Sequence, residues 1–157
     1  MEPHTFEVAL AWPAHPAQKR PPDPAFSRNA TLSAPGHEPF AASSPTIFGG
    51  EATRYNPEEL LALALSHCLM LTYLAVAAKR RLEVIAYADR ATATLAPGPS
   101  GKVQVTDVLL RPVVTLPRGA DLEAARAMHD KAHDHCFVAN SVNFPVRHEP
   151  SFVEAGT

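Results

Sequence analysis

Apolar and polar residues alternate with a period of two near the start of the chain. Residues 5–12 follow this pattern, and residues 25–34 repeat it before the turn at Pro35-Gly36. Both segments are therefore predicted to form half-buried strands, with a proline-rich connection between them. Residues 40–56 carry Ser, Thr, Gly and Pro at close intervals. This composition is typical of a long loop, and long loops in compact domains are often functional.

The next segment predicts a long helix from Pro57 to about Lys79. Asn56 can cap it, Pro57 suits the first helical position, and the two glutamates that follow favour the positive end of the helix dipole. Residues 60–78 are apolar on nearly every face, as in a membrane span or a helix buried all round. Ser66, His67 and other polar residues in its middle favour the buried helix, which a second subunit would help to cover.

The rest of the chain predicts a hairpin, a second helix and a last strand. Residues 82–96 and 102–116 alternate, are rich in β-branched side chains and are joined by the turn sequence PGPSG. Apolar residues then recur at helical spacing from a capping Asp121 to Cys136. Residues 141–147 are expected to form an edge strand, because Pro145 fits only there. This order of elements indicates an α+β fold.

Composition narrows the class of protein. A chain of 157 residues, 46% of them hydrophobic and 19% charged, is expected to fold as one domain over residues 1–157. With 14 basic and 16 acidic residues and no basic cluster on the scale of a phosphate backbone, nucleic acid is not an expected partner. Residues 1–12 do not read as a secretory signal, so we expect a cytoplasmic protein that does not bind a membrane.

The chain has two cysteines, Cys68 and Cys136, which are too few for a disulfide scaffold. Cys68 lies in the middle of the long helix, where the helix dipole does not lower its pKa, so an inert buried thiol is one interpretation. His67 points about 100° away from it around the helix and is interpreted first as a core or interface histidine. A reactive Cys68 would need a cation from elsewhere in the fold.

A second cluster of candidate residues is His129, His133, His135 and Cys136. The first two histidines are one helical turn apart, as in a zinc-binding pair, and Cys136 adds a third candidate ligand. The interleaved charged residues equally resemble a solvated helix face. A metal-binding protein centred on His129, His133 and Cys136 is therefore one hypothesis.

Two segments together resemble the OsmC/Ohr family of thiol-dependent hydroperoxide reductases. They are NPEELLALALSHCLMLTYLAVAA, residues 56–78, and HCFVANSVNFPV, residues 135–146. The resemblance implies an OsmC-like α+β fold in an intertwined homodimer, with strands of both subunits around central long helices. It also implies that Cys68 is the peroxidatic cysteine, which forms a sulfenic acid, and that Cys136 is the resolving cysteine, which closes a transient disulfide.

The family activity implied is reduction of organic, especially fatty-acid-derived, hydroperoxides to alcohols in defence against oxidative stress. A dithiol such as dihydrolipoamide would restore the thiols, and no cofactor or metal is needed. Apolar neighbours of the thiol, namely Leu71, Met70 and Phe137, are candidates to receive an alkyl tail or are simply core. The alternative is a non-catalytic dimeric binding module of the same fold. Many relatives carry a small residue at the position of His67, so this larger polar ring beside the nucleophile is a departure that puts peroxidase efficiency in question.

By the same resemblance, Glu58 matches a glutamate that pairs with an arginine to activate the thiolate. Ten residues of helix separate Glu58 from Cys68, or about 15 Å of rise. Glu58 is therefore expected to act on the partner subunit's cysteine, at a dimer interface. Arg28 is the first choice for this arginine, and Arg20 or Arg54 could take the role instead. In that case Arg28 would simply be a solvated strand residue.

Overall fold

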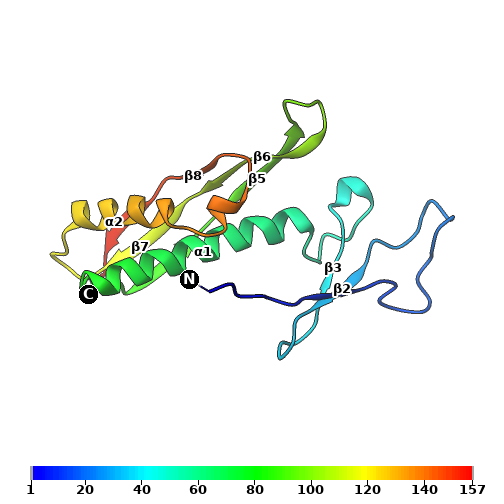
Figure 1. Ribbon diagram of the computed structural model, residues 1–157, viewed down its shortest axis with the longest axis horizontal. Helices are drawn as coiled ribbons and strands as arrows, with labels where there is room; N and C mark the ends of the chain where they lie inside the picture. Colours follow the sequence, from blue (N-terminus) through cyan, green and yellow to red (C-terminus); the bar gives the residue numbers. More distant parts are fainter. Residues whose placement is uncertain (1, 157) are drawn as a thin grey trace. The chain divides into compact units, whose positions relative to one another are not determined.

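The computed structural model describes residues 2–156, which divide into two compact units, one ending at Leu60 and the other beginning at Leu61. The first unit contains a three-stranded antiparallel sheet in the order β1-β2-β3 (Figure 1). Its elements are β1 (Ala9–Ala11), β2 (Ala30–Ser33), β3 (Phe40–Ala42) and the short 3-10 helix η1 (Thr46–Phe48). The two strands predicted from alternation are confirmed in shortened form.

The strand β3 corrects the prediction of a continuous loop over residues 40–56. Leu32 of β2 pairs with Phe40 of β3, and the Phe40 ring packs edge-on against Tyr55 at 6.1 Å between centroids. The Ser43 N–H also donates to the Tyr55 carbonyl at 2.9 Å. Pairing with β2 thus satisfies backbone groups that the local Ser, Thr and Pro content predicted to face solvent.

The long helix α1 runs from Pro57 to Lys79, as predicted. Its start is a reciprocal cap: the Glu59 N–H donates to Asn56 Oδ1 at 2.9 Å, and the Asn56 N–H donates to Glu59 Oε2 at 3.0 Å. This pair satisfies two backbone donors that a helix start otherwise leaves unpaired. Local sequence therefore fixes where α1 begins.

The end of α1 is a left-handed cap at Arg81, whose φ is 58°. The Leu82 N–H donates to the Ala77 carbonyl at 2.9 Å, and the Arg81 N–H donates to the Ala78 carbonyl at 3.1 Å. Glycine normally occupies this position, because a Cβ is disfavoured there.

We expect Arg81→Gly to raise the free energy of unfolding by about 1 kcal/mol, measured by urea denaturation. A loss of stability would show that the arginine side chain makes a compensating contact.

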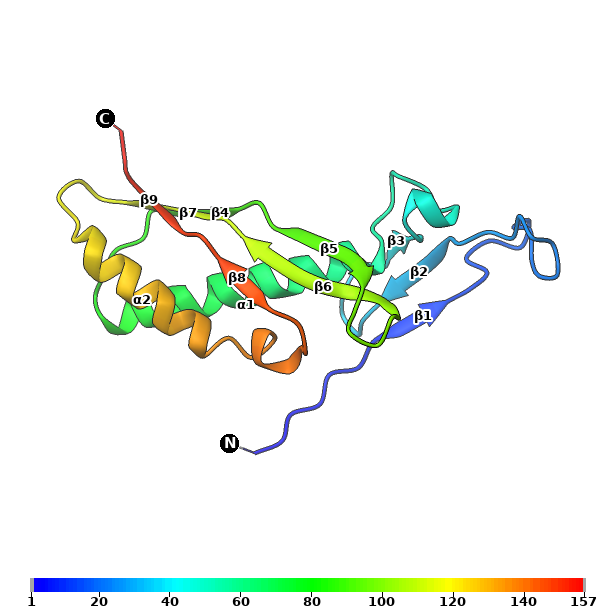
Figure 2. The same cartoon turned by 90° about the horizontal axis from the view of Figure 1, so that it is seen from above.

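The second unit contains two mixed three-stranded sheets, ordered β4-β7-β9 and β5-β6-β8, with α2 alongside α1 in both views (Figure 1, Figure 2). The strands and helices of this unit are β4 (Ala86–Asp89), β5 (Thr92–Pro97), β6 (Val103–Leu110), β7 (Pro112–Leu116), α2 (Leu122–Asp134), η2 (Ala139–Ser141), β8 (Val146–His148) and β9 (Ser151–Glu154). The predicted hairpin is confirmed as β5 and β6. Each predicted strand is divided, so that β4 and β7 pair in the other sheet.

The prediction of a strand over residues 141–147 is wrong in its bounds. Ser141 ends a 3-10 turn, and β8 begins only at Val146. Pro145 stays outside the strand, where its carbonyl accepts the Val108 N–H at 3.1 Å. β8 and β9 run parallel to β6 and β7. Such pairing depends on partners far along the chain, so local alternation did not indicate β9.

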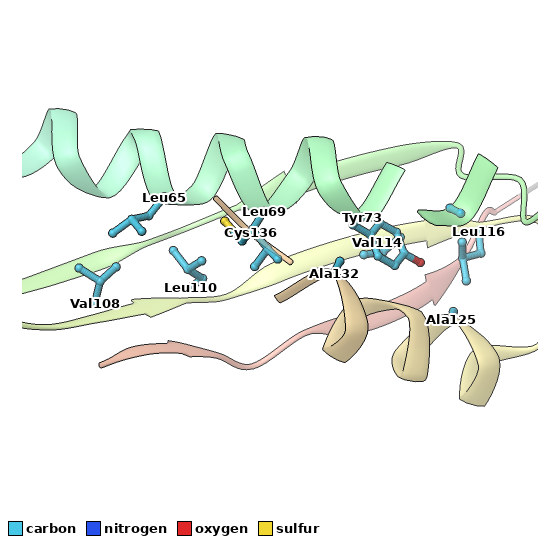
Figure 3. Packing of buried hydrophobic residues seen from close by; sticks show 11 residues of the cluster. Leu65, Leu69, Tyr73, Val108, Leu110, Val114, Leu116, Ala125, Ala132 and Cys136 are labelled. Carbon is cyan, nitrogen blue, oxygen red and sulfur yellow. The ribbon is translucent and has the colours of Figure 1, made fainter. Parts of the chain in front are cut away.

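Side chains spaced four residues apart on α1 form the core of the second unit (Figure 3). These are Leu65, Leu69, Tyr73 and Ala77, which pack against Val108, Leu110, Val114, Leu116, Ala125, Ala132 and Cys136. The opposite face is open in the single chain: Leu63 is 51% and Leu71 is 52% exposed. One chain by itself therefore buries only one face of α1, and the predicted cover of the other face by a second subunit stays a prediction. Among residues 2–156, α1 alone has the length and hydropathy of a membrane span.

Candidate active site

The two cysteine thiols are brought together within the second unit. Cys68 is a half-buried residue of α1, and Cys136, which follows α2 by two residues, has no exposed surface. Both are free thiols, and Cys68 packs against the core cluster that contains Cys136 and raises the pKa of that thiol. In Figure 3 the Cys136 sulfur lies beside Leu69 of α1. The residues are far apart in sequence, so packing of α2 against α1 creates this pair.

The surroundings of Cys136 keep it protonated. Burial raises the pKa of Cys136 to about 11, and the neighbouring Cys68 thiol also raises it, while the backbone N–H groups of Ala139 and Val138 lower it. At neutral pH Cys136 is thus a thiol rather than a thiolate. Of the two sulfurs, only Cys68 also faces an open groove.

Two hydrogen bonds fix the segment of α1 around Cys68. The Thr72 hydroxyl donates to the Cys68 carbonyl at 2.9 Å, and the Ser66 hydroxyl donates to Asp89 Oδ2 at 2.6 Å. The other oxygen of Asp89 accepts the Arg111 N–H at 2.7 Å. Asp89 therefore ties α1 to the junction between β6 and β7, where it satisfies a backbone donor that the division of the strands leaves free.

A groove of about 660 Å³ opens at Cys68, a size typical of small-molecule sites. Its lining is mostly apolar and comes from α1 and from the end of α2. The lining residues are Cys68, Leu71, Thr72, Ala75, Val76, Lys79, Arg80, Lys131, His135 and Phe137. Of the three apolar residues named from sequence as tail contacts, Leu71 and Phe137 line this groove and Met70 does not. An apolar ligand can reach Cys68 here, with cationic side chains on the groove wall.

Arg28 and Glu58 belong to the first unit. The Arg28 guanidinium lies 3.7 Å from the Phe26 ring centroid and donates to the backbone carbonyls of Phe26 and Pro24. Glu58 has a buried Oε2 that accepts no hydrogen bond from residues 2–156. No ion pair joins Arg28 to Glu58 in that part of the chain. Among residues 2–156, Glu58 Oε2 thus lacks a hydrogen-bond donor and the Arg28 guanidinium lacks a carboxylate partner.

The alternative arginines differ in their contacts. Arg54 Nε lies 2.7 Å from Glu51 Oε2 in an ion pair. Arg20 donates to the Pro16 carbonyl at 2.8 Å and, like Arg28, has no carboxylate partner among residues 2–156. Arg54 is already neutralised by Glu51, so Arg28 and Arg20 are the better candidates to pair with Glu58.

The hypothesis of a metal site at His129, His133 and Cys136 is not supported by the geometry. Among residues 2–156, no three His, Cys, Asp or Glu side chains converge as metal ligands. His129 bonds Tyr87 and His148, and His133 bonds the Val146 carbonyl. Sequence analysis missed Tyr87 and His148, because nothing near either residue in the chain marks them as partners of α2. His67 is exposed and lines no wall of the groove.

Comparison with known proteins identifies the family. The family model described as OsmC-like protein matches residues 49–151. An OsmC-like protein of unknown function from Vibrio cholerae is 33% identical over 94% of this chain and 99% of its own, with a TM-score of 0.85. This chain belongs to the OsmC-like family. No match was found among the curated proteins.

More distant structures share the fold. An organic hydroperoxide resistance protein from Elizabethkingia anophelis is 18% identical over 98% of this chain and 99% of its own, with a TM-score of 0.71. The organic hydroperoxide resistance protein OhrB of Bacillus subtilis is 19% identical over 95% of this chain and 98% of its own, with a TM-score of 0.65. These matches confirm the α+β, OsmC-like fold expected from sequence.

Proposed function

We propose that this protein is a thiol peroxidase that reduces organic hydroperoxides through a cycle of two cysteines. One observation carries the proposal: a half-buried thiol, Cys68, opens into an apolar groove and lies beside a fully buried second thiol, Cys136. Membership of the OsmC-like family and the fold shared with organic hydroperoxide resistance proteins support it.

The first step uses Cys68 as the nucleophile. Its thiolate attacks one peroxide oxygen, the O–O bond breaks, an S–O bond forms, and the alkoxide that leaves takes a proton to become the alcohol. Leu71 and Phe137 on the groove wall are suited to an alkyl tail. Hydroperoxides of fatty-acid type therefore fit this site better than hydrogen peroxide.

The second step uses Cys136. Its sulfur attacks the Cys68 sulfenic acid, an S–S bond forms and the S–O bond breaks, and the hydroxyl leaves with the thiol proton as water. A dithiol of the dihydrolipoamide kind then reduces the disulfide by thiol exchange. In this scheme the two thiols supply both sulfurs of the disulfide, so closure needs no cofactor.

We further propose a homodimer in which Arg28 and Glu58 complete the site. The open apolar face of α1, where Leu63 is about half exposed, would be covered by the second subunit. Glu58 has a buried oxygen without a donor and Arg28 has a charge without a carboxylate. Paired with Glu58, Arg28 would stabilise the Cys68 thiolate by a charge-assisted contact. We place this dimer in the cytoplasm.

Mass spectrometry during titration with cumene hydroperoxide tests the proposal. Wild-type protein is expected to lose about two mass units per chain at one equivalent, through closure of the disulfide, and to regain them with reduced lipoamide. Cys68→Ser is expected to show no change. Absence of rapid oxidation in folded wild-type protein would contradict the peroxidase and favour a non-catalytic binding module.

A further inference from the structure

A cluster of imidazole and phenol rings joins α2 to β4 and β8, and the peroxidase cycle does not use it. Its members are Tyr87 of β4, His129 and His133 of α2, and His148 of β8, which we call the histidine latch. The Tyr87 hydroxyl lies 3.1 Å from His129 Nε2, and His129 Nδ1 lies 3.2 Å from His148 Nδ1. His133 Nε2 donates to the Val146 carbonyl at 2.7 Å.

The rings also pack face to face. The His148 ring stacks on His133 with 4.3 Å between centroids and on His129 with 5.2 Å. Tyr87 and His129 are stacked at 6.1 Å, and Tyr73 of α1 lies 5.1 Å from His129. His129 has no exposed surface. A polar ring buried this completely is stable only when its nitrogens are hydrogen-bonded.

Neutral imidazoles favour one direction of hydrogen bonding through the latch. The two facing Nδ1 atoms share one hydrogen, so one ring donates and the other accepts. With that hydrogen on His129, its Nδ1 donates to His148, and its Nε2 accepts from the Tyr87 hydroxyl. His148 then carries its hydrogen on Nε2, which faces Asp130 Oδ1 at 3.8 Å. Both nitrogens of His129 are satisfied in this arrangement.

The latch is connected to Cys136 through the last turn of α2. The Cys136 N–H donates to the His133 carbonyl at 3.1 Å, and the Cys136 carbonyl accepts the Asn140 N–H at 3.0 Å. His129 and His133 lie one turn apart on the same face, and both contact β8. Movement of these two side chains would therefore carry the Cys136 backbone with it.

We propose that His129 is a positioning residue for the resolving cysteine. Through Tyr87 and His148 it fixes the last turns of α2, and with them the Cys136 sulfur beside Cys68. A disulfide forms only when the two Cα atoms come within a narrow range of distances, so a displacement of about 1 Å matters. The inference rests on the proposed function and concerns its second step alone, in which the Cys136 sulfur is oxidised and the Cys68 sulfur is reduced.

The test compares closure of the disulfide with the first oxidation of Cys68. His129→Phe keeps a ring in the core and removes both hydrogen bonds. After one equivalent of cumene hydroperoxide, sulfenic acid formation is expected to stay within about twofold of wild type, while disulfide closure slows about tenfold or more. His129→Gln places an amide near Nε2 and is expected to restore part of the closure rate.

Two further variants keep the test decisive. Tyr87→Phe removes one hydrogen bond of the latch and is expected to slow closure several-fold even if His129→Phe does not fold. Tyr73→Phe is the matched control, because its hydroxyl lies in the same ring cluster but has no hydrogen-bond partner among residues 2–156. Its closure rate is expected to equal that of wild type.

A measurement without peroxide separates this inference from the proposed function. The Cys68–Cys136 disulfide is equilibrated with glutathione, and the quantity compared is the squared concentration of reduced glutathione divided by that of oxidised glutathione. Half-reduction is expected at a value of this ratio about tenfold lower for His129→Phe and several-fold lower for Tyr87→Phe than for wild type. Folded variants with wild-type closure rates and wild-type glutathione equilibria would overturn the positioning role. Failure of wild type to react with peroxide, with the shift in glutathione equilibrium intact, would count against the peroxidase only.

The pH dependence of the closure rate is a second measurement, and a purely structural role of His129 would not change it. The groups that face His129 are Tyr73, Tyr87, His148 and Phe152 from the packed elements, with His133 and Arg126 on its own helix; Asp130 faces His148. Protonation of both facing imidazoles would set two N–H groups head to head. Closure is therefore expected to slow more steeply in wild type than in His129→Gln as pH falls from about 5 toward 4, where His129 begins to bind a proton, and equal slopes would overturn the assignment.

Discussion

Replacement of Cys136 with serine is expected to leave the first oxidation of Cys68 intact and to stop the cycle there. Cys136 is the thiol that lies beside Cys68 in the second unit, and the serine hydroxyl forms no disulfide. The Cys68 sulfenic acid then persists and a second peroxide converts it to sulfinic acid. Steady-state peroxide reduction with a dithiol is expected to fall by about tenfold or more, measured by consumption of cumene hydroperoxide.

Mass spectrometry separates this outcome from loss of folding. The Cys136→Ser chain is expected to gain the mass of one oxygen at one equivalent of peroxide and of a second oxygen at excess. An unchanged recycling rate in Cys136→Ser would remove Cys136 from the mechanism.

In the wild-type chain, closure of the disulfide is expected to speed up as pH rises from 7 toward 9, because burial keeps the pKa of Cys136 at about 11.

Acidification is expected to destabilise the protein between about pH 6.5 and pH 4, and the buried His129 is the main cause. Burial lowers the pKa of His129 to about 4, with further lowering by the charges of His148, His133 and Arg126. Unfolded histidine titrates near 6.5, so below that pH the unfolded chain binds a proton that the folded chain does not. The contribution of His129 to the free energy of unfolding is therefore largest above pH 6.5 and is lost as the pH falls toward 4.

The expected size of this effect is about 3 kcal/mol for His129 between those two pH values. Burial also lowers the pKa of His148, so its contribution has the same sign. Urea denaturation of wild type and His129→Gln from pH 7.5 to 4.5 measures it. The variant is expected to be less stable at pH 7.5 but to lose less stability on acidification. Parallel curves would mean that another group controls the acid response.

The sequence was most informative where local rules decide the outcome. The first and last residues of α1 follow from a cap at Asn56, a proline at the first position and the end of the apolar run at Lys79. The N-cap of α2 at Asp121 and the hairpin of β5 and β6 were equally accessible. Each of these features depends on residues within a few positions of one another.

The sequence was least informative where strands pair across long distances. Nothing in residues 40–42 or 151–154 indicated strands, because β3 and β9 are stabilised by β2 and β7 rather than by their own composition. The division of each hairpin arm into strands of two sheets was also hidden. β-pairing is a property of the partner as much as of the segment.

The amino-acid sequence by itself determined that Cys68 lies in the middle of a long apolar helix and that Cys136 follows a second, amphipathic one. Only the tertiary structure decided that Cys68 packs against the core that contains Cys136, that one thiol opens into a groove while the other is buried, and that His129 hydrogen-bonds Tyr87 and His148. Helix periodicity is set by neighbours along the chain, whereas these contacts exist only once α1, α2, β4 and β8 pack on one core.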